Sequence, residues 1–196
     1  MSVVLVDAGG TNIGSVRYAL QRLGVDAALT LDAATIRTAD KVILPGVGAA
    51  GPGMMRLREL GLVDLLRSLT QPVLGVCLGM QLLCSHSEED DTACLDLIPA
   101  QVRHISATPG LRVPHMGWNR VTVTTEHPLL AGLGDDEQAY FVHSYAVPMG
   151  EWTLASSDHG EPFSAVIARD NYYGMQFHPE RSAAVGAKLL KNFLSL

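Results

Sequence analysis

The sequence predicts an α/β fold of three layers, in which a mostly parallel central sheet is flanked by helices and additional antiparallel strands occupy the C-terminal half. Over roughly the first 85 residues, short apolar runs alternate with segments of helical period, the pattern of strand–helix–strand units. Later segments of strand length are separated only by Pro, Gly or acidic turns. Hydrophobic residues make up 47% of the chain, which is enough to form a buried core.

The first half of the chain supplies the parallel strands and their connecting helices. Residues 3–6 form a continuous apolar run, typical of a buried strand, and residues 12–23 place apolar side chains at helical spacing. Further strands are expected at residues 25–29, 41–44 and 73–76. A second helix is expected at residues 57–69, and the strand at residues 73–76 leads directly into a helix at residues 78–83.

The second half is expected to be a series of strands followed by one helix. An acidic run at residues 88–91 indicates a surface loop. The expected strands are residues 112–116, 120–124, 140–142, 152–156, 164–168 and 172–177. The last helix, residues 183–194, has an apolar side and lysines in its later turns. No linker or repeat is visible, so residues 1–196 are expected to form one domain.

The composition argues against several kinds of partner and site. A formal net charge of -6 argues against nucleic acid, and no apolar run approaches the roughly 18 residues of a membrane span. Asp7 interrupts the first apolar run before it could serve as an export signal. Three cysteines without a C-x-x-C pair favour a reducing cytoplasm over a disulfide framework. The histidines show no metal-ligand spacing, so neither a metal nor a cofactor is expected.

One cysteine lies in a pattern typical of a nucleophile. Gly75-Val76-Cys77-Leu78-Gly79 has the form Gly-x-nucleophile-x-Gly at the expected turn from strand to helix. Its glycines leave room for a crowded backbone, and unpaired N–H groups at a helix start favour a thiolate. The alternative is a buried cysteine acting as a small hydrophobic residue, which is the role expected for Cys84. We assign no role to Cys94.

The segment Phe177-His178-Pro179-Glu180 could supply a base and the group that orients it, both of which acyl transfer by a thiolate requires. Proline favours an extended backbone at the preceding residue, and residues two apart in an extended segment point the same way. His178 and Glu180 are therefore expected to project together. The alternative is a solvated strand end with two polar side chains. The presence of the Cys77 turn in the same sequence favours the catalytic interpretation over this alternative.

Pro45-Gly46-Val47-Gly48 follows the third expected strand, next to the strand that carries Cys77. Ligand sites in open parallel sheets lie at the carboxyl ends of the strands. These residues could therefore bring main-chain N–H groups close to a substrate and form half of an oxyanion hole, with the N–H of Leu78 as the other half. An ordinary turn is equally compatible with the pattern.

Together the motifs at residues 45–48, 75–81 and 177–180 resemble those of the class I (triad) glutamine amidotransferases. The resemblance implies an enzyme in which Cys77 is the nucleophile, His178 the general base and then acid, and Glu180 its orienting carboxylate. It further implies that Gln81 and the segment His143-Ser144-Tyr145 contact the bound glutamine.

Within that family, residues 114–119, 140–145 and 178–182 are similar to segments of the glutaminase subunits of imidazole glycerol phosphate synthase. This resemblance implies hydrolysis of glutamine through a cysteine thioester, with the ammonia passed in histidine biosynthesis to a cyclase subunit in a heterodimer. The implied cyclase is a (β/α)8 barrel, which takes about 250 residues, more than this chain contains.

A contact face for such a partner is expected to contain Asn12, Met116, Trp118, Asn119 and Arg181, since Trp and Arg often anchor interfaces. For Trp118 the alternative is core packing. The sequence departs from the family at Asp7-Ala8-Gly9-Gly10-Thr11-Asn12, where a tyrosine and a glycine are missing. That turn lacks the phosphate-loop motifs and is expected to cap a helix.

Three other functions are also compatible with the sequence. A self-contained cysteine hydrolase, such as a peptidase or gamma-glutamyl hydrolase, could use the same triad, although the sequence around Cys77 lacks the papain signature. The chain could serve as the amidotransferase subunit of another pathway. A binding module without activity could also share the fold, because fold does not imply function.

Overall fold

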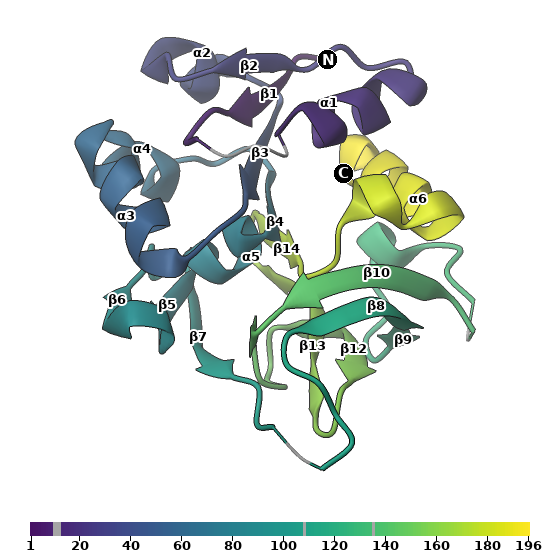
Figure 1. Ribbon diagram of the computed structural model, residues 1–196. Helices are drawn as coiled ribbons and strands as arrows, with labels where there is room; N and C mark the ends of the chain where they lie inside the picture. Colours follow the sequence, from purple (N-terminus) through teal and green to yellow (C-terminus); the bar gives the residue numbers. More distant parts are fainter. Residues whose placement is uncertain (10–12, 108, 135) are drawn as a thin grey trace.

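The structure is a computed structural model that describes residues 1–9, 13–107, 109–134 and 136–196. Its centre is an eight-stranded sheet with the strand order β2-β1-β3-β4-β14-β13-β12-β9 (Figure 1). The parallel part consists of β2 (Ala28–Thr30), β1 (Val3–Val6), β3 (Lys41–Gly46), β4 (Val73–Cys77) and β14 (Tyr172–Met175). Antiparallel pairing continues through β13 (Pro162–Arg169), β12 (Thr153–Asp158) and β9 (Thr122–Val123). The expected α/β fold class is confirmed.

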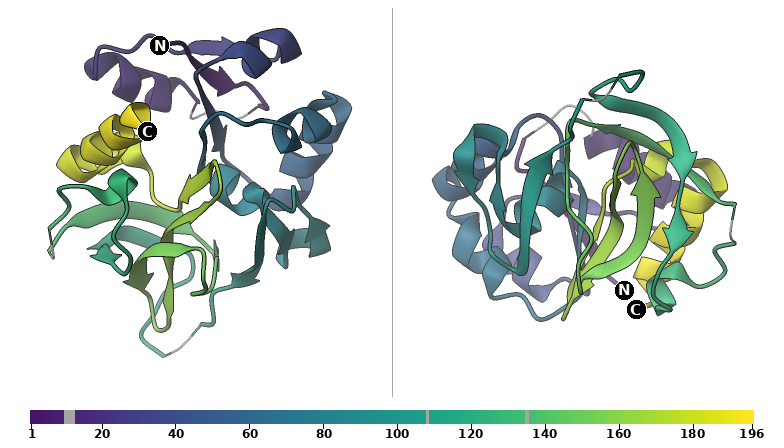
Figure 2. Two further views of the ribbon diagram at one scale, coloured as in Figure 1. Left: turned by 180° about the vertical axis from the view of Figure 1, so that it is seen from behind. Right: turned by 90° about the horizontal axis from the view of Figure 1, so that it is seen from below.

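Helices cover both faces of this sheet (Figure 2, right). One face is covered by α1 (Ile13–Arg22) and α6 (Ala183–Ser195), and the other by α2 (Ala33–Thr38), α3 (Ala50–Glu59), α4 (Leu62–Arg67) and α5 (Leu78–Leu83). Alternate residues of β1 serve the two cores: Val3 and Leu5 pack on one side, Val4 and Val6 on the other. A strand buried on both faces needs a continuous apolar run, which explains the pattern at residues 3–6.

Two smaller sheets flank the central one. The antiparallel pair of β8 (His115–Arg120) and β10 (Gln138–His143) lies near α6 (Figure 1). The other small sheet has the order β11-β7-β5-β6, formed by β11 (Tyr145–Ala146), β7 (Ile98–His104), β5 (Cys84–Ser87) and β6 (Thr92–Ala93). Short 3-10 turns are η1 (Glu89–Asp91), η2 (Pro128–Leu130) and η3 (Pro179–Arg181).

Several expected elements differ in extent from those observed. The helix expected at residues 57–69 is two helices, α3 and α4, because Gly61 between them adopts a left-handed conformation with φ of 66°. The strand expected at residues 25–29 begins only at Ala28, and the one expected at residues 112–116 is β8, which starts at His115. Pro45 and Gly46 extend β3 rather than ending it.

The helix α2 and the strands β5, β6 and β7 were not expected from the sequence. β5 and β6 are short, β5 (Cys84–Ser87) carries mostly polar residues without a clear alternating pattern, and the run that forms β7 is interrupted by Pro99. Their pairing with one another, rather than their composition, makes them strands. The helix that follows Cys77 ends at Leu83, as expected, and Cys84 begins β5.

The topology brings three carboxyl strand ends together. β3, β4 and β14 are adjacent and parallel, so their last residues lie at the same edge of the sheet. Gly46 lies opposite Cys77, and Met175 lies opposite Val76. His178 follows three residues after Met175, which brings it near Cys77 although 101 positions separate the two in the sequence.

Candidate active site

Cys77 lies at a sharp turn between β4 and α5. Its backbone has φ of 54° and ψ of -114°, a conformation that is strained for a residue with a side chain and typical of nucleophile turns. A Cβ added to Gly79 would overlap the carbonyl oxygen of Leu44, and one added to Gly75 would overlap Gly79. Glycine at both positions is therefore required for the close packing of α5 against β3 and β4, and this packing holds Cys77 in place.

His178 and Glu180 meet across a turn. The His178 backbone is extended, as expected before proline, but residues Pro179–Arg181 form the 3-10 turn η3 instead of a continuing extended segment. His178 Nδ1 lies 3.0 Å from Glu180 Oε1 across this turn. The main chain of Tyr140 fixes the turn at both ends, because its oxygen accepts from the N–H of His178 and its N–H donates to Ser182 Oγ.

The electrostatic state of His178 is set by two neighbours. A hydrogen bond joins the His178 side chain to that of Cys77. Burial disfavours the charged ring, but the hydrogen bonds to Cys77 and Glu180 and the negative charges of both groups outweigh burial and raise the pKa of His178 to about 10. The ring is therefore protonated at neutral pH when these two neighbours are charged, which is the condition for an ion pair with the cysteine.

A pocket of about 290 Å³ lies over Cys77 and His178. This volume is close to the lower end of the range of about 300–1,000 Å³ that is usual for small-molecule sites. The pocket is lined by Val47, Gly48, Cys77, Leu78, Gln81, Glu89, Pro114, Val142, His143, Ser144, Tyr145 and His178. Most of the residues expected to contact glutamine therefore surround one cavity.

Gly46 is the one expected substrate contact outside this pocket. It pairs with Cys77 in the sheet, and a Cβ there would lie 2.6 Å from the Gly79 nitrogen. Gly46 therefore lies beneath the Cys77 turn. Val47 and Gly48 line the cavity together with Leu78. Leu78 is the first residue of α5, where main-chain N–H groups lack helical partners. An oxyanion could be bound between these two segments.

Buried amides connect the pocket wall to the nucleophile. Gln81 Nε2 donates to the Tyr145 carbonyl oxygen at 3.0 Å and to Gln176 Oε1 at 2.9 Å. Gln176 is fully buried, and its Nε2 lies 3.9 Å from Cys77 Sγ. The sequence analysis did not identify Gln176, although it lies two positions before His178 on the extension of the strand that brings His178 to the site.

Glu89 is a second site residue that sequence analysis missed. It belongs to η1, in the acidic run predicted to be a surface loop, yet its side chain lines the pocket. Its Oε2 accepts from the N–H of Ala50 at 2.8 Å. Burial and the neighbouring charge of Asp90 raise its pKa, against the opposing effect of the Ala50 hydrogen bond. Only its position relative to Cys77 could distinguish it from the other three acidic residues of the run.

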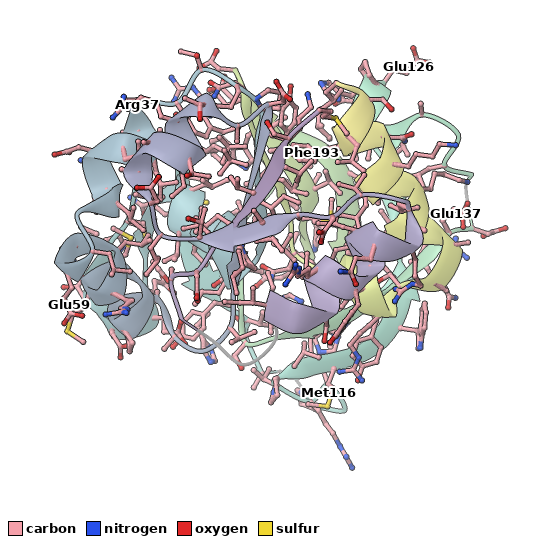
Figure 3. All side chains as sticks on the ribbon, turned by 90° about the horizontal axis from the view of Figure 1, so that it is seen from above. Arg37, Glu59, Met116, Glu126, Glu137 and Phe193 are labelled. Atoms are coloured by element: carbon pink, nitrogen blue, oxygen red, sulfur yellow. The ribbon has the colours of Figure 1, made fainter. Side chains whose placement is uncertain are left out.

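Three of the residues expected at a partner face, Met116, Trp118 and Arg181, lie on the outer side of β8 and η3, whereas the Asn119 side chain points to the opposite side of β8 and bonds His115. Met116 and Trp118 are 63% and 53% exposed, so Trp118 is not core packed. Arg181 lies 4.2 Å above the ring of Tyr140, which also contacts Trp118. Met116 lies at the periphery of the molecule, whereas Phe193 of α6 points into the interior (Figure 3). Asn119 is half-buried, and Asn12 lies outside the described residues.

The other two cysteines are inaccessible. Cys84 is fully buried and Cys94 nearly so, and burial raises the pKa of the Cys94 thiol to about 11 and that of Cys84 further. Across the described ranges, no three His, Cys, Asp or Glu side chains form a group that could hold a metal ion. Within the same ranges, no helix is both long and apolar enough to cross a bilayer.

Known proteins resemble this chain over nearly its whole length. The imidazole glycerol phosphate synthase subunit HisH of Xanthomonas euvesicatoria pv. vesicatoria is 57% identical over 194 residues, which is 99% of this chain and 97% of the relative. The subunit of the same name from Xylella fastidiosa (strain Temecula1) is 53% identical with the same coverage.

Solved structures share the fold at lower identity. A glutamine amidotransferase crystal structure matches with a TM-score of 0.77 at 20% identity, covering 100% of this chain and 98% of that one. PurLQS from Thermotoga maritima matches with a TM-score of 0.72 at 15% identity, covering 99% and 97%. The model of the family "Glutamine amidotransferase class-I" matches residues 4–196. The chain therefore belongs to the class I glutamine amidotransferase family.

Proposed function

We propose that this chain is the glutaminase subunit of imidazole glycerol phosphate synthase. It hydrolyses glutamine to glutamate and ammonia and delivers the ammonia to a cyclase subunit in histidine biosynthesis. The observation that carries the proposal is the Cys77–His178–Glu180 arrangement at the base of a pocket. The names of the relatives at 57% and 53% identity support the synthase over an unrelated cysteine hydrolase or a silent binding module.

Ammonia is released in the first half of the reaction. The Cys77 thiolate attacks the carbon of the glutamine side-chain amide, and the carbonyl becomes an oxyanion. The protonated His178 gives its proton to the amide nitrogen, the carbon–nitrogen bond breaks, and ammonia leaves a thioester behind. The raised pKa of His178 supports this step, since the ring then holds the proton that the leaving group needs.

Glutamate is released in the second half. His178, now neutral, takes a proton from water as the oxygen attacks the thioester carbon. The carbon–sulfur bond breaks, glutamate leaves, and the thiolate–imidazolium pair is restored. In both halves the oxyanion would be bound by the N–H of Leu78 and the segment Val47–Gly48, whose position in the pocket supports this role. One such donor is typically worth about 2.7–4 kcal/mol in the transition state.

Recognition of an amino acid as substrate requires a group for its ammonium. Glu89 is the carboxylate in the pocket lining that can supply it. Gln81 and the segment from His143 to Tyr145 form the adjoining wall. Both ring nitrogens of His143 already bind protein groups, so we expect this residue to contact glutamine through its main chain.

The partner is proposed to be a (β/α)8-barrel cyclase that binds the exposed face of β8 and η3. Trp118 and Arg181 form that face with Tyr140, an aromatic and cationic cluster of the kind that anchors interfaces. We also propose that residues 1–196 form a single domain and that the protein works in the cytoplasm. The match of one family model to residues 4–196 supports the first of these proposals.

Replacement of the nucleophile tests the proposal. Cys77→Ala should abolish glutamine-dependent synthesis of imidazole glycerol phosphate by the complex with the cyclase, while synthesis from added ammonium should persist. Cys94→Ala, at a buried thiol outside the pocket, is the matched control and should keep both activities. Glutaminase activity in Cys77→Ala would overturn the nucleophile assignment. Glutamine hydrolysis by the wild type without any coupling to a cyclase would favour the stand-alone hydrolase.

A further inference from the structure

A chain of hydrogen bonds behind the pocket fixes the proton position on two buried histidines. His143 Nδ1 lies 2.8 Å from the Tyr145 carbonyl oxygen, which can only accept, so Nδ1 carries a hydrogen. In a neutral ring Nε2 is then an acceptor. His115 Nδ1 lies 2.8 Å from it and must be the donor. His115 Nε2 in turn accepts from Asn119 Nδ2 at 3.1 Å.

The orientation of the Asn119 amide is fixed independently of the histidines. Its Nδ2 donates to the carbonyl oxygen of Asp158 at 2.7 Å, and its Oδ1 accepts from the N–H of Arg120 at 2.8 Å. Reversal of the amide would lose both bonds. Every donor in the chain therefore points from β8 toward the Tyr145 carbonyl, and main-chain groups anchor both ends.

The chain keeps this direction only if both rings are neutral. His115 and His143 are 4% and 6% exposed, and His115 stacks on Phe141 and on His159 with centroid distances of 5.0 and 4.1 Å. Burial and the charge of His159 lower the pKa of His115 to about 4. Burial lowers the pKa of His143 to about 3, with the neighbouring histidines adding to it and the bond to Tyr145 opposing it. Both rings are thus uncharged near neutrality.

The chain ends on a carbonyl that also organises the pocket. The Tyr145 oxygen accepts from Gln81 Nε2 as well as from His143. Gln81 binds Gln176, whose Nε2 approaches Cys77 Sγ. A shift of the His143 ring would therefore move the wall of the pocket and the buried amides beneath the nucleophile together.

We propose that His115 is a positioning residue of the glutamine pocket, holding His143 in a single neutral tautomer and, through it, the Tyr145 carbonyl and the Gln81 amide. The inference rests on the proposed function, because it concerns the cavity in which glutamine would bind. His115 and Asn119 belong to β8, the strand whose exposed side carries Trp118. The chain of bonds thus joins the proposed partner face to the pocket.

Two matched variants test the role of the His115 donor. His115→Asn keeps an amide donor near the position of Nδ1, and His115→Leu keeps a similar shape without any donor. We expect the KM for glutamine, measured on the full chain with its cyclase partner, to rise about 3- to 10-fold in His115→Leu. The kcat should change less, and His115→Asn should recover most of the loss. Alkylation of Cys77 by iodoacetamide should keep its pH profile in both, since Cys77 and His178 are untouched.

Nitrogen NMR of the histidine rings tests the proposed hydrogen bonding of His115 and His143 without an activity measurement. In the wild-type chain, both rings should be neutral and protonated at Nδ1, and in His115→Leu the Nε2 signal of His143 should lose the shift of a hydrogen-bonded acceptor. A wild-type His143 protonated at Nε2, an unchanged KM in His115→Leu, or an Asn variant no better than Leu would overturn the proposal. Absence of glutaminase activity in the wild type would instead reject the proposed function. The NMR result would still decide the tautomer of His143.

Discussion

Cys77 and His178 acquire their chemistry from their neighbours. The cysteine occupies a backbone conformation that few residues adopt, and the histidine holds its proton because two acidic groups flank it in a buried setting. While Cys77 and Glu180 are charged, the raised pKa of His178 keeps the imidazolium present up to about pH 10, and the proton is lost above it. Activity that depends on this proton should therefore fall at high pH, not near the usual histidine pKa of about 6.5.

Glu180→Gln should lower both the rate and the upper pH limit of the reaction. Without the carboxylate the imidazolium is less favoured, so the high-pH limb of kcat/KM should move to lower pH. In a comparable triad, loss of the orienting carboxylate costs about 3 × 10⁴ in kcat and loss of the nucleophile about 2 × 10⁶, so the variant should retain more activity than Cys77→Ala. A pH profile of glutamine hydrolysis checks both effects, and an unmoved limb would contradict them.

Glu89→Gln should weaken glutamine binding with little change in kcat. Loss of a charge-assisted bond to the α-ammonium costs about 1.5–3 kcal/mol, which corresponds to a KM roughly 10- to 150-fold higher. Steady-state kinetics measure this, with the exposed Glu126→Gln as the control variant. For a glutamine analogue without the α-amino group, wild type and Glu89→Gln should have the same KM. If Glu89→Gln raised the KM for this analogue as much as the KM for glutamine, Glu89 would not contact the α-ammonium.

At the scale of elements, the site depends on how closely helices approach the sheet and its following turn. α5 packs against β3 through glycines, and α6 packs against η3 in the same way. A Cβ added to Gly186 of α6 would overlap the carbonyl oxygen of Pro179, which lies between His178 and Glu180. The position of the base and its orienting carboxylate is thus coupled to the packing of the last helix.

Gly186→Ala should destabilise the protein and impair the reaction. Overpacking of this kind typically costs about 1–3 kcal/mol, which lowers Tm by several degrees in a chain of this size. Gly14→Ala is the matched control, because it is also a helical glycine but its nearest neighbour, Tyr18 Cε2, would be 3.9 Å away. It should raise stability by up to about 1 kcal/mol. Thermal unfolding measures the Tm of both variants. A Tm that changed in the same direction in Gly186→Ala and Gly14→Ala would contradict this account.

At the scale of the molecule, one face bears the pocket and another exposes the apolar side chains of Met116 and Trp118. β8 contributes to both, since His115 is buried behind the pocket while Met116 and Trp118 on the same strand are exposed. This arrangement follows from the fact that successive side chains of a strand point to opposite sides. A partner bound to the outer side of β8 would therefore lie one strand away from the glutamine site.

Trp118→Ala should weaken binding of the cyclase subunit. Truncation of a tryptophan at an interface hot spot costs about 2 kcal/mol or more, which raises Kd about 30-fold. Titration calorimetry of the two subunits measures this, with Met149→Ala as a control at an exposed apolar residue that is not part of β8. Equal affinity of wild type and Trp118→Ala would remove Trp118 from the interface.

The sequence by itself determined the fold class, most strands of the central sheet and the segments that carry Cys77, His178 and Glu180. These follow from local patterns: apolar runs, helical spacing, glycines around a turn and a proline after a histidine. Helix boundaries were less predictable, because the break at Gly61 depends on a conformation that the apolar pattern does not encode.

Tertiary structure alone decided which residues complete the site. Gln176, Glu89 and His115 come from three separate parts of the chain, and no local pattern assigns a role to any of these side chains, although His115 lies within the family-like segment 114–119. Their roles depend on β14 pairing with β4, on η1 folding back over α3, and on β8 pairing with β10. Pairings between distant segments bury these polar groups together, and only after burial must each find a hydrogen-bond partner, so local sequence cannot specify them.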